Sequence, residues 1–133
     1  MSFRIVNGVM AALMAFAVVV QYNDPDPLLW IGLYAAACAI CLAAAVRGVI
    51  PVSPALVVGA VALAWALAVA AGVPAAVYTH MFDAWEMQSA TIEEARETSG
   101  LLIVAAWMAV LCWVGWRGRR SPGTRGAVAR HGR

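Results

Sequence analysis

The stretch Tyr22-Asn23-Asp24-Pro25-Asp26-Pro27 places two aspartates and two prolines between long apolar runs. Proline disfavours the α conformation in the residue before it, so the first helix is expected to stop near Tyr22. Pro27 suits the first position of a second helix, because its fixed φ is helical and its missing N–H is not needed there. The stretch therefore predicts a stiff turn that holds two apolar helices antiparallel.

The two aspartates of this turn have different expected roles. Asp26 directly precedes Pro27 and is predicted to be the N-cap of the second helix, where its carboxylate accepts a hydrogen bond from an N–H in the first turn. Asp24 has no helix end to cap, since Pro25 holds its backbone extended. Asp24 is therefore either a solvated turn residue or a functional acid.

Aromatic side chains flank the turn. Trp30 and Tyr34 lie four residues apart and are expected on one face of the second helix. Trp30 is also expected at the depth of the membrane interface, as is Tyr22 at the end of the first helix. Pro25, Pro27, Trp30 and Tyr34 are predicted to form the structural turn and its interface.

Composition indicates a membrane protein, because 64% of the 133 residues are hydrophobic and only 12% are charged. Soluble domains are about 45–50% apolar, whereas a helix that crosses a bilayer needs roughly 20 apolar residues. Backbone groups in lipid must be paired within the segment, and the alternation of barrel strands is absent here, so helices are expected. The predicted fold is an all-α integral membrane four-helix bundle. Its spans are predicted at residues 5–22, 28–46, 55–73 and 100–116.

One membrane domain is expected over residues 1–118, followed by a disordered basic cytoplasmic tail over residues 119–133. Ala15-Phe16-Ala17 has the small-x-small form of a signal cleavage site. The apolar run continues through Val20, so a retained first span is predicted, with cleavage as the alternative.

Charge is distributed unevenly along the chain. All seven carboxylates fall in the first and third connections: Asp24, Asp26, Asp83, Glu86, Glu93, Glu94 and Glu97. Of the nine basic residues, only Arg96 lies among them. The others lie at the N-terminus, in the second connection or after the last span: Arg4, Arg47, Arg117, Arg119, Arg120, Arg125, Arg130 and Arg133. The positive-inside rule therefore predicts cytoplasmic N- and C-termini and outward-facing first and third connections.

Several classes of function find little support in the sequence. Cys38 and Cys41 form a C-x-x-C inside the second span, where packing is expected rather than redox or zinc chemistry, and Cys112 is interpreted in the same way. No span contains a histidine, which argues against a haem. The span interiors also contain no Asp, Glu, Lys, Arg or His, which argues against transport. No nucleic-acid partner is expected, since anchoring to anionic lipid accounts for the basic tail.

The segment between the third and fourth spans carries a pattern of its own. Tyr78, Met81, Phe82 and Trp85 recur at helical spacing, which predicts a short amphipathic helix at the membrane interface. Two interpretations remain for the polar residues between them. They form a solvated edge, or His80 and Asp83 bind a metal.

The fourth helix is expected to begin near Ile92 and to stand above the bilayer, because Thr91 and Glu94 match a capping box. Glu93, Arg96, Glu97 and Gly100 then share one face, where Arg96 can pair with Glu93. These charges are either a solvated surface or part of a polar cluster with the first turn.

The motif Gln21-Tyr22-Asn23-Asp24-Pro25-Asp26-Pro27, followed by Trp30 and Tyr34, resembles the signature of the transmembrane protein 220 family, small four-span proteins of bacteria and animals. A second stretch, Glu94-Ala95-Arg96-Glu97 with Gly100-Leu101 after it, also resembles the family's pattern before its last span. The resemblance covers nearly the whole chain, excluding the basic segment after Arg117. It implies a membrane protein and carries no established activity.

These observations favour a non-enzymatic accessory or interaction protein, located in the plasma membrane, or in the inner membrane if bacterial. The alternative is a small-molecule or divalent-metal binding protein, with enzyme chemistry as one form of it. The expected partners are the lipid bilayer and another membrane or exported protein. No cofactor is predicted, apart from a weak Ca²⁺ or Mg²⁺ site at Asp24 and Glu97. The candidate polar cluster consists of Asn23, Asp24, Asp26, Glu93, Arg96 and Glu97.

Overall fold

The computed structural model describes residues 3–23, 27–83 and 89–120, and every regular element within these ranges is helical. Four of the helices are long and apolar enough to cross a membrane, which confirms the predicted all-α architecture. The elements, with η marking a 3-10 helix, are α1 (Phe3–Val20), η1 (Gln21–Asn23), α2 (Pro27–Arg47), α3 (Val52–Ala70), η2 (Ala75–Thr79) and α4 (Ala90–Arg120).

The short connection between α2 and α3 is made by a glycine followed by a proline. Gly48 has φ of +67°, and its N–H donates to the carbonyl of Ala44 over 3.2 Å. A glycine in the left-handed conformation directly after the last helical residue is a common helix terminator, because it has no Cβ to clash. Helix α3 begins just after Pro51, so the two helices are closely joined.

Helix α4 is capped by Ser89. The Ser89 Oγ accepts from the Ile92 N–H at 3.3 Å, and the Ser89 carbonyl accepts from the Glu93 N–H at 3.2 Å. The predicted capping box at Thr91 is therefore wrong, since Thr91 lies inside the helix. At its other end α4 continues to Arg120, so Arg119 is helical rather than part of the predicted tail, of which residues 121–133 lie outside the described ranges.

The segment before α4 contains the 3-10 helix η2, which starts earlier than the predicted amphipathic pattern and includes Tyr78 of it. Pro74, with extended backbone, precedes it, and His80 follows it. It ends before Met81 and Phe82, and Trp85 lies outside the described residues. Of the predicted pattern, Tyr78 thus lies in η2, and Met81 and Phe82 lie in the turn after it.

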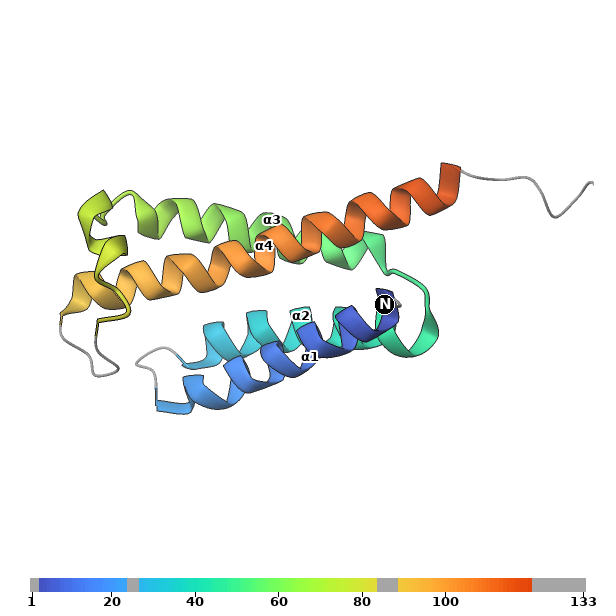
Figure 1. Ribbon diagram of the computed structural model, residues 1–133, viewed down its shortest axis with the longest axis horizontal. Helices are drawn as coiled ribbons and strands as arrows, with labels where there is room; N and C mark the ends of the chain where they lie inside the picture. Colours follow the sequence, from blue (N-terminus) through green and yellow to red (C-terminus); the bar gives the residue numbers. More distant parts are fainter. Residues whose placement is uncertain (1–2, 24–26, 84–88, 121–133) are drawn as a thin grey trace, which may run out of the picture.

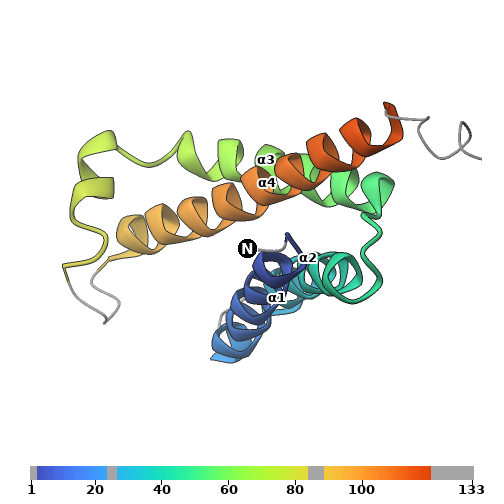
Figure 2. The ribbon, with the colours of Figure 1, turned by 45° about the vertical axis from the view of Figure 1, so that its right-hand side comes forward.

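The four long helices form two antiparallel hairpins. Figure 1 shows α1 beside α2 and α3 beside α4, and the backbones approach most closely within these pairs. Figure 2 shows the first hairpin inclined to the second. Large side chains fill the space between the hairpins.

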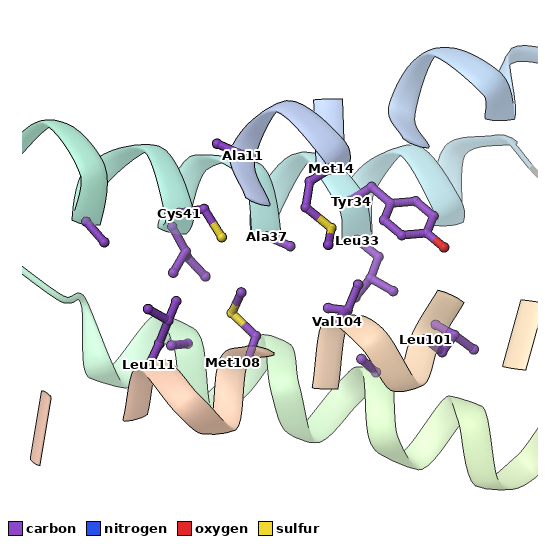
Figure 3. Packing of buried hydrophobic residues seen from close by; sticks show 14 of the residues in the cluster. Ala11, Met14, Leu33, Tyr34, Ala37, Cys41, Leu101, Val104, Met108 and Leu111 are labelled. Atoms are coloured by element: carbon purple, nitrogen blue, oxygen red, sulfur yellow. The ribbon is translucent and has the colours of Figure 1, made fainter. Parts of the chain in front are cut away.

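The core lies where α4 faces the first hairpin. Its buried stripe is spaced three or four residues apart, as expected for one helical face, and consists of Ala95, Thr98, Leu101, Val104, Met108 and Leu111. In Figure 3 the side chains of Leu101, Val104, Met108 and Leu111 lie opposite residues of α1 and α2, among them Met14 and Cys41.

The outward faces of the helices are apolar as well. Large side chains such as Phe16, Val19, Leu28 and Leu67 are exposed. Soluble monomers rarely show contiguous apolar surface on this scale. In a bilayer these faces meet hydrocarbon, which agrees with four candidate spans.

The two ends of the molecule differ in charge. Figure 1 shows that η1, η2 and the first turn of α4 lie at one end, while the start of α1, the α2–α3 connection and the last turns of α4 lie at the other. The carboxylates all fall within residues 24–26 and 83–97. We refer to the first end as the acidic end and to the second as the basic end.

Candidate functional site at the acidic end

Arg96 links α4 to the segment that follows η2. Its Nε donates to the carbonyl of Met81 over 2.8 Å, and its Nη1 lies 3.6 Å from Oε2 of Glu93. The predicted pair between Arg96 and Glu93 is therefore present. The Arg96 side chain is only 23% exposed, so its position is determined by packing as well as by these polar contacts.

Met81 makes a second connection to the same helix. The Ser99 hydroxyl oxygen lies 3.5 Å from the Met81 sulfur and 2.9 Å from the carbonyl of Ala95, to which it donates within α4. Arg96 and Ser99 therefore approach the backbone and the side chain of a single residue. The turn after η2 is thus held against the first three turns of α4.

Tyr34 meets α4 from the first hairpin. Its ring is buried and stacks on Trp30 with centroids 6.2 Å apart, and Trp30 stacks on Trp65 of α3 at 4.4 Å. The sequence places Trp30 at interface depth, and the structure shows its side chain turned into the bundle. Three aromatic rings therefore join the two hairpins near the acidic end.

The Tyr34 hydroxyl lies directly against Gly100, where a Cβ would collide with its oxygen. Figure 3 shows the hydroxyl pointing along the bundle in the direction of Leu101 rather than Leu111. Glu97, one turn before Leu101, is near enough to act electrostatically on the hydroxyl. Gly100 and Glu97 thus connect the polar face of α4 to the buried aromatic group of α2.

His80 and Asp83 form an exposed pair at the end of η2. Their Nδ1 and Oδ2 atoms are 2.9 Å apart. Within the described ranges, no group of three or more His, Cys, Asp or Glu side chains comes together in a way that could hold a metal ion. The contact that the structure describes for this pair is a local hydrogen bond.

Part of the predicted cluster lies outside the described residues, namely Asp24, Pro25 and Asp26. Asn23 ends η1, and its side chain is likewise not described. Pro27 is the first residue of α2, in the position that its geometry favours. Convergence of Asp24 with Arg96 and Glu97 stays a prediction.

Two buried polar residues have no counterpart among the predicted site residues. Asn7 is fully buried in α1; its Nδ2 donates to the carbonyl of Phe3 over 2.9 Å, and its Oδ1 has no hydrogen-bond partner among the described residues. Thr98 donates to the carbonyl of Glu94 over 2.8 Å. A lone carboxamide within an apolar run was the signal that could have identified Asn7.

The cysteines pack between helices, as their position in the spans suggests. Cys38 Sγ approaches the carbonyl of Ala11 at 3.3 Å, and Cys112 Sγ approaches the carbonyl of Val52 at 3.6 Å. Cys41 is fully buried in the core. Each thiol therefore contacts a neighbouring helix or lies between helices.

Small residues of the long helices differ in how closely a neighbouring helix approaches them. A Cβ on Gly59 would lie 2.9 Å from Cβ of Met108, so α3 and α4 approach closely there. A Cβ on Gly8 would meet nothing within 4 Å, and Ala12 and Ala60 are exposed. Gly59 therefore makes the close contact in this group.

Comparison with known proteins gives one family. The model described as Transmembrane family 220, helix matches residues 13–113, which is most of the chain. The matched range includes the whole of α2 and α3 and the part of α4 that carries Arg96, Glu97 and Gly100. No solved structure matches this chain.

Proposed function

Because this chain belongs to the transmembrane 220 family and carries four candidate spans, we propose that it is a non-enzymatic accessory protein of the membrane. In this proposal its acidic end docks another membrane or exported protein. The observation that carries the proposal is the way Arg96 is held between Glu93 and the Met81 carbonyl at the top of α4. A polar group that is already ordered loses less conformational entropy when a partner binds.

The side chains around Arg96 support a docking role. Phe82, next to Met81, is 79% exposed, and Tyr22 at the same end of the molecule is 80% exposed. Aromatic residues, methionine and arginine are enriched at protein interfaces, and Tyr and Arg are common among the residues that contribute most to binding. An exposed ring next to the residue that holds the Arg96 guanidinium, with a second exposed ring at the same end of the molecule, therefore suits a protein partner.

The orientation belongs to the same proposal. The basic end faces the cytoplasm and the acidic end faces outward, as the positive-inside rule requires for this distribution of arginines. The partner is then a protein whose accessible part lies outside the membrane. This is why a membrane or exported protein is proposed rather than a cytoplasmic one.

Co-purification from native membranes in mild detergent tests the docking surface. Phe82→Ala removes an exposed ring without removing a core contact, and Phe16→Ala is the matched control, since Phe16 is also exposed but lies on α1. We expect Phe82→Ala to reduce the co-purified partner and Phe16→Ala to retain it. Asp24→Asn is expected to reduce it as well. An unchanged partner set in both acidic-end variants would contradict the proposal.

The alternative function is a divalent-metal or small-molecule site that uses Asp24 and Glu97. Thermal unfolding of the same preparations distinguishes it from the docking proposal. A metal site requires millimolar Ca²⁺ to raise the unfolding midpoint of the wild-type protein, because binding only the folded state stabilises it. Asp24→Asn would then remove the gain. In the docking proposal, Ca²⁺ and EDTA leave the midpoint unchanged, while Arg96→Ala lowers it.

A further inference from the structure

A cleft of about 490 Å³ opens at the basic end, between the start of α1, the α2–α3 connection and the last turns of α4. Its volume is within the range of about 300–1,000 Å³ that is usual for ligand sites. Val49, Ile50 and Val114 contribute apolar lining, and Arg4 and Arg119 contribute two guanidinium groups. The cleft thus combines positive charge with apolar surface.

Arg4 is held in place by the end of α2. Its Nε donates to the carbonyl of Ala45 over 2.7 Å, and its Nη2 donates to the carbonyl of Val46 over 2.6 Å. These carbonyls belong to the last turn of the helix, where the helix dipole is negative. A guanidinium has five N–H donors, so Arg4 can hold these carbonyls and still donate to an anion.

Arg119 differs from the arginines on either side of it. Arg117 lies 4.0 Å over the ring of Trp113, and Arg120 lies 3.5 Å over the ring of Trp116. These two guanidinium groups therefore stack on aromatic faces. Arg119, between them in the sequence, is the one that lines the cleft.

The charge of the cleft and its position relative to the membrane surface indicate its ligand. The carboxylates that the structure describes, Asp83, Glu93, Glu94 and Glu97, lie at the opposite end of the molecule. Among the described residues, no acidic side chain therefore lies beside the two arginines of the cleft. Exposed tryptophans at the end of an apolar span, such as Trp113 and Trp116, are typical of the membrane–water interface. At that depth the abundant anion is a lipid phosphate, which arginine binds in bidentate geometry.

We propose that this cleft binds one anionic phospholipid, with the phosphate between Arg4 and Arg119 and the acyl chains against the apolar lining. Both arginines lie outside residues 13–113, the range that the family model matches. The site is independent of the docking surface, which lies at the acidic end.

Gly118 provides a way to fill the cleft without changing its charge. It lines the cleft, and a Cβ built on it would meet nothing within 4 Å. Gly115, also in the lining, is unsuitable because its Cβ would lie 2.5 Å from Cγ2 of Val52. A larger side chain at Gly118 therefore takes the ligand's space, whereas one at Gly115 would push apart two packed segments.

Native mass spectrometry of the full-length protein in detergent tests the proposal. Phosphatidylglycerol is titrated against phosphatidylcholine, and we expect one molecule of phosphatidylglycerol to be retained with roughly tenfold or greater preference, as hydrogen bonds to charged groups would give. Millimolar inorganic phosphate should not displace it. Displacement would show that a free anion is the ligand and would overturn the lipid assignment.

Matched variants distinguish specific binding in the cleft from attraction of the lipid by the general positive charge of the basic end. Arg4→Gln with Arg119→Gln should abolish the preference, whereas Arg117→Gln with Arg120→Gln, which removes the same charge from the same end, should retain it. Equal losses in the two pairs would overturn the proposal. Because Arg4 also ties α1 to α2, Arg119→Gln and Gly118→Leu are measured singly, and unchanged preference in both would likewise overturn it.

Discussion

Gly100 leaves the space that the Tyr34 hydroxyl occupies. We predict that Gly100→Ala destabilises the protein by about 1–3 kcal/mol, the usual effect of forcing an extra methyl group into a packed site. This loss should appear although alanine is the better helix former by about 0.5–1 kcal/mol. The measurement is the unfolding midpoint of purified protein in detergent.

Gly32→Ala is the control for this substitution, because Gly32 lies in the same helix as Tyr34 and a Cβ there would meet nothing within 4 Å. Gly32→Ala should leave the midpoint unchanged or raise it. Adding Tyr34→Phe to Gly100→Ala should restore part of the loss, since it removes the colliding oxygen. If Gly100→Ala proves as stable as Gly32→Ala, the close approach of Tyr34 to α4 is contradicted.

At the scale of elements, the start of α4 depends on Ser89. Ser89→Ala removes the side-chain acceptor of the Ile92 N–H and should lower the free energy of unfolding by about 1 kcal/mol. Thr91→Ala should be neutral or slightly stabilising, because Thr91 lies within the helix, where alanine is favoured. Amide hydrogen exchange in the first turn of α4 should increase in the Ser89 variant alone. If Thr91→Ala lowered the free energy of unfolding more than Ser89→Ala, Thr91 rather than Ser89 would be the N-cap.

The N-cap of α4 shows how precisely the local sequence can predict where a helix begins. Ser89 and Thr91 are both acceptable N-caps, and Glu94 completes a capping box only with Thr91. The sequence pattern therefore favours the wrong residue by one half-turn. The existence of the helix was predictable because its apolar stretch is long, while its first residue depends on which hydroxyl meets the amide, and spacing alone does not determine that.

At the scale of the whole molecule, the orientation in the membrane can be measured without knowledge of the function. Single cysteines are placed at Ser89 and Ser121 in a background in which Cys38, Cys41 and Cys112 are replaced by alanine. In intact cells, an impermeant thiol reagent should label the cysteine at position 89 and leave that at position 121 protected. The reason is the concentration of arginines at the basic end.

Permeabilised cells provide the control, because both positions should then react equally. Labelling of position 121 alone in intact cells would reverse the proposed orientation. Labelling of both positions would exclude any arrangement in which the two ends lie on opposite sides of the membrane.

The overall architecture was predictable because lipid leaves a chain few alternatives. Apolar runs of spanning length must form helices. The Asp-Pro turn predicts that the first two are antiparallel, and the positions of the arginines predict which ends of the helices face the cytoplasm. The way the helices pair was not predictable, since every face of every span is apolar. Trp30 illustrates this, because an aromatic residue near a span end suits the lipid interface or the bundle interior equally well.

The candidate site was only partly predictable for the same reason. Glu93 and Arg96 are one turn apart, so local spacing was enough to predict their pairing. The contacts of Arg96 with Met81 and of Gly100 with Tyr34 join segments distant in the sequence. No periodicity within one helix reveals which neighbour will lie against it.

The pairing of consecutive helices has a consequence for the order in which the molecule is made. Each hairpin joins neighbours in sequence, so α1 and α2 can associate before α3 and α4 have left the ribosome. The stripe that fills the space between the hairpins belongs to α4, which is synthesised after the other three long helices. Until α4 arrives, the inner face of the first hairpin, including Tyr34 and Cys41, lacks the part of the core that α4 contributes, although Trp65 of α3 can already stack on Trp30. The same helix therefore both completes the interior and brings Arg96 to the acidic end.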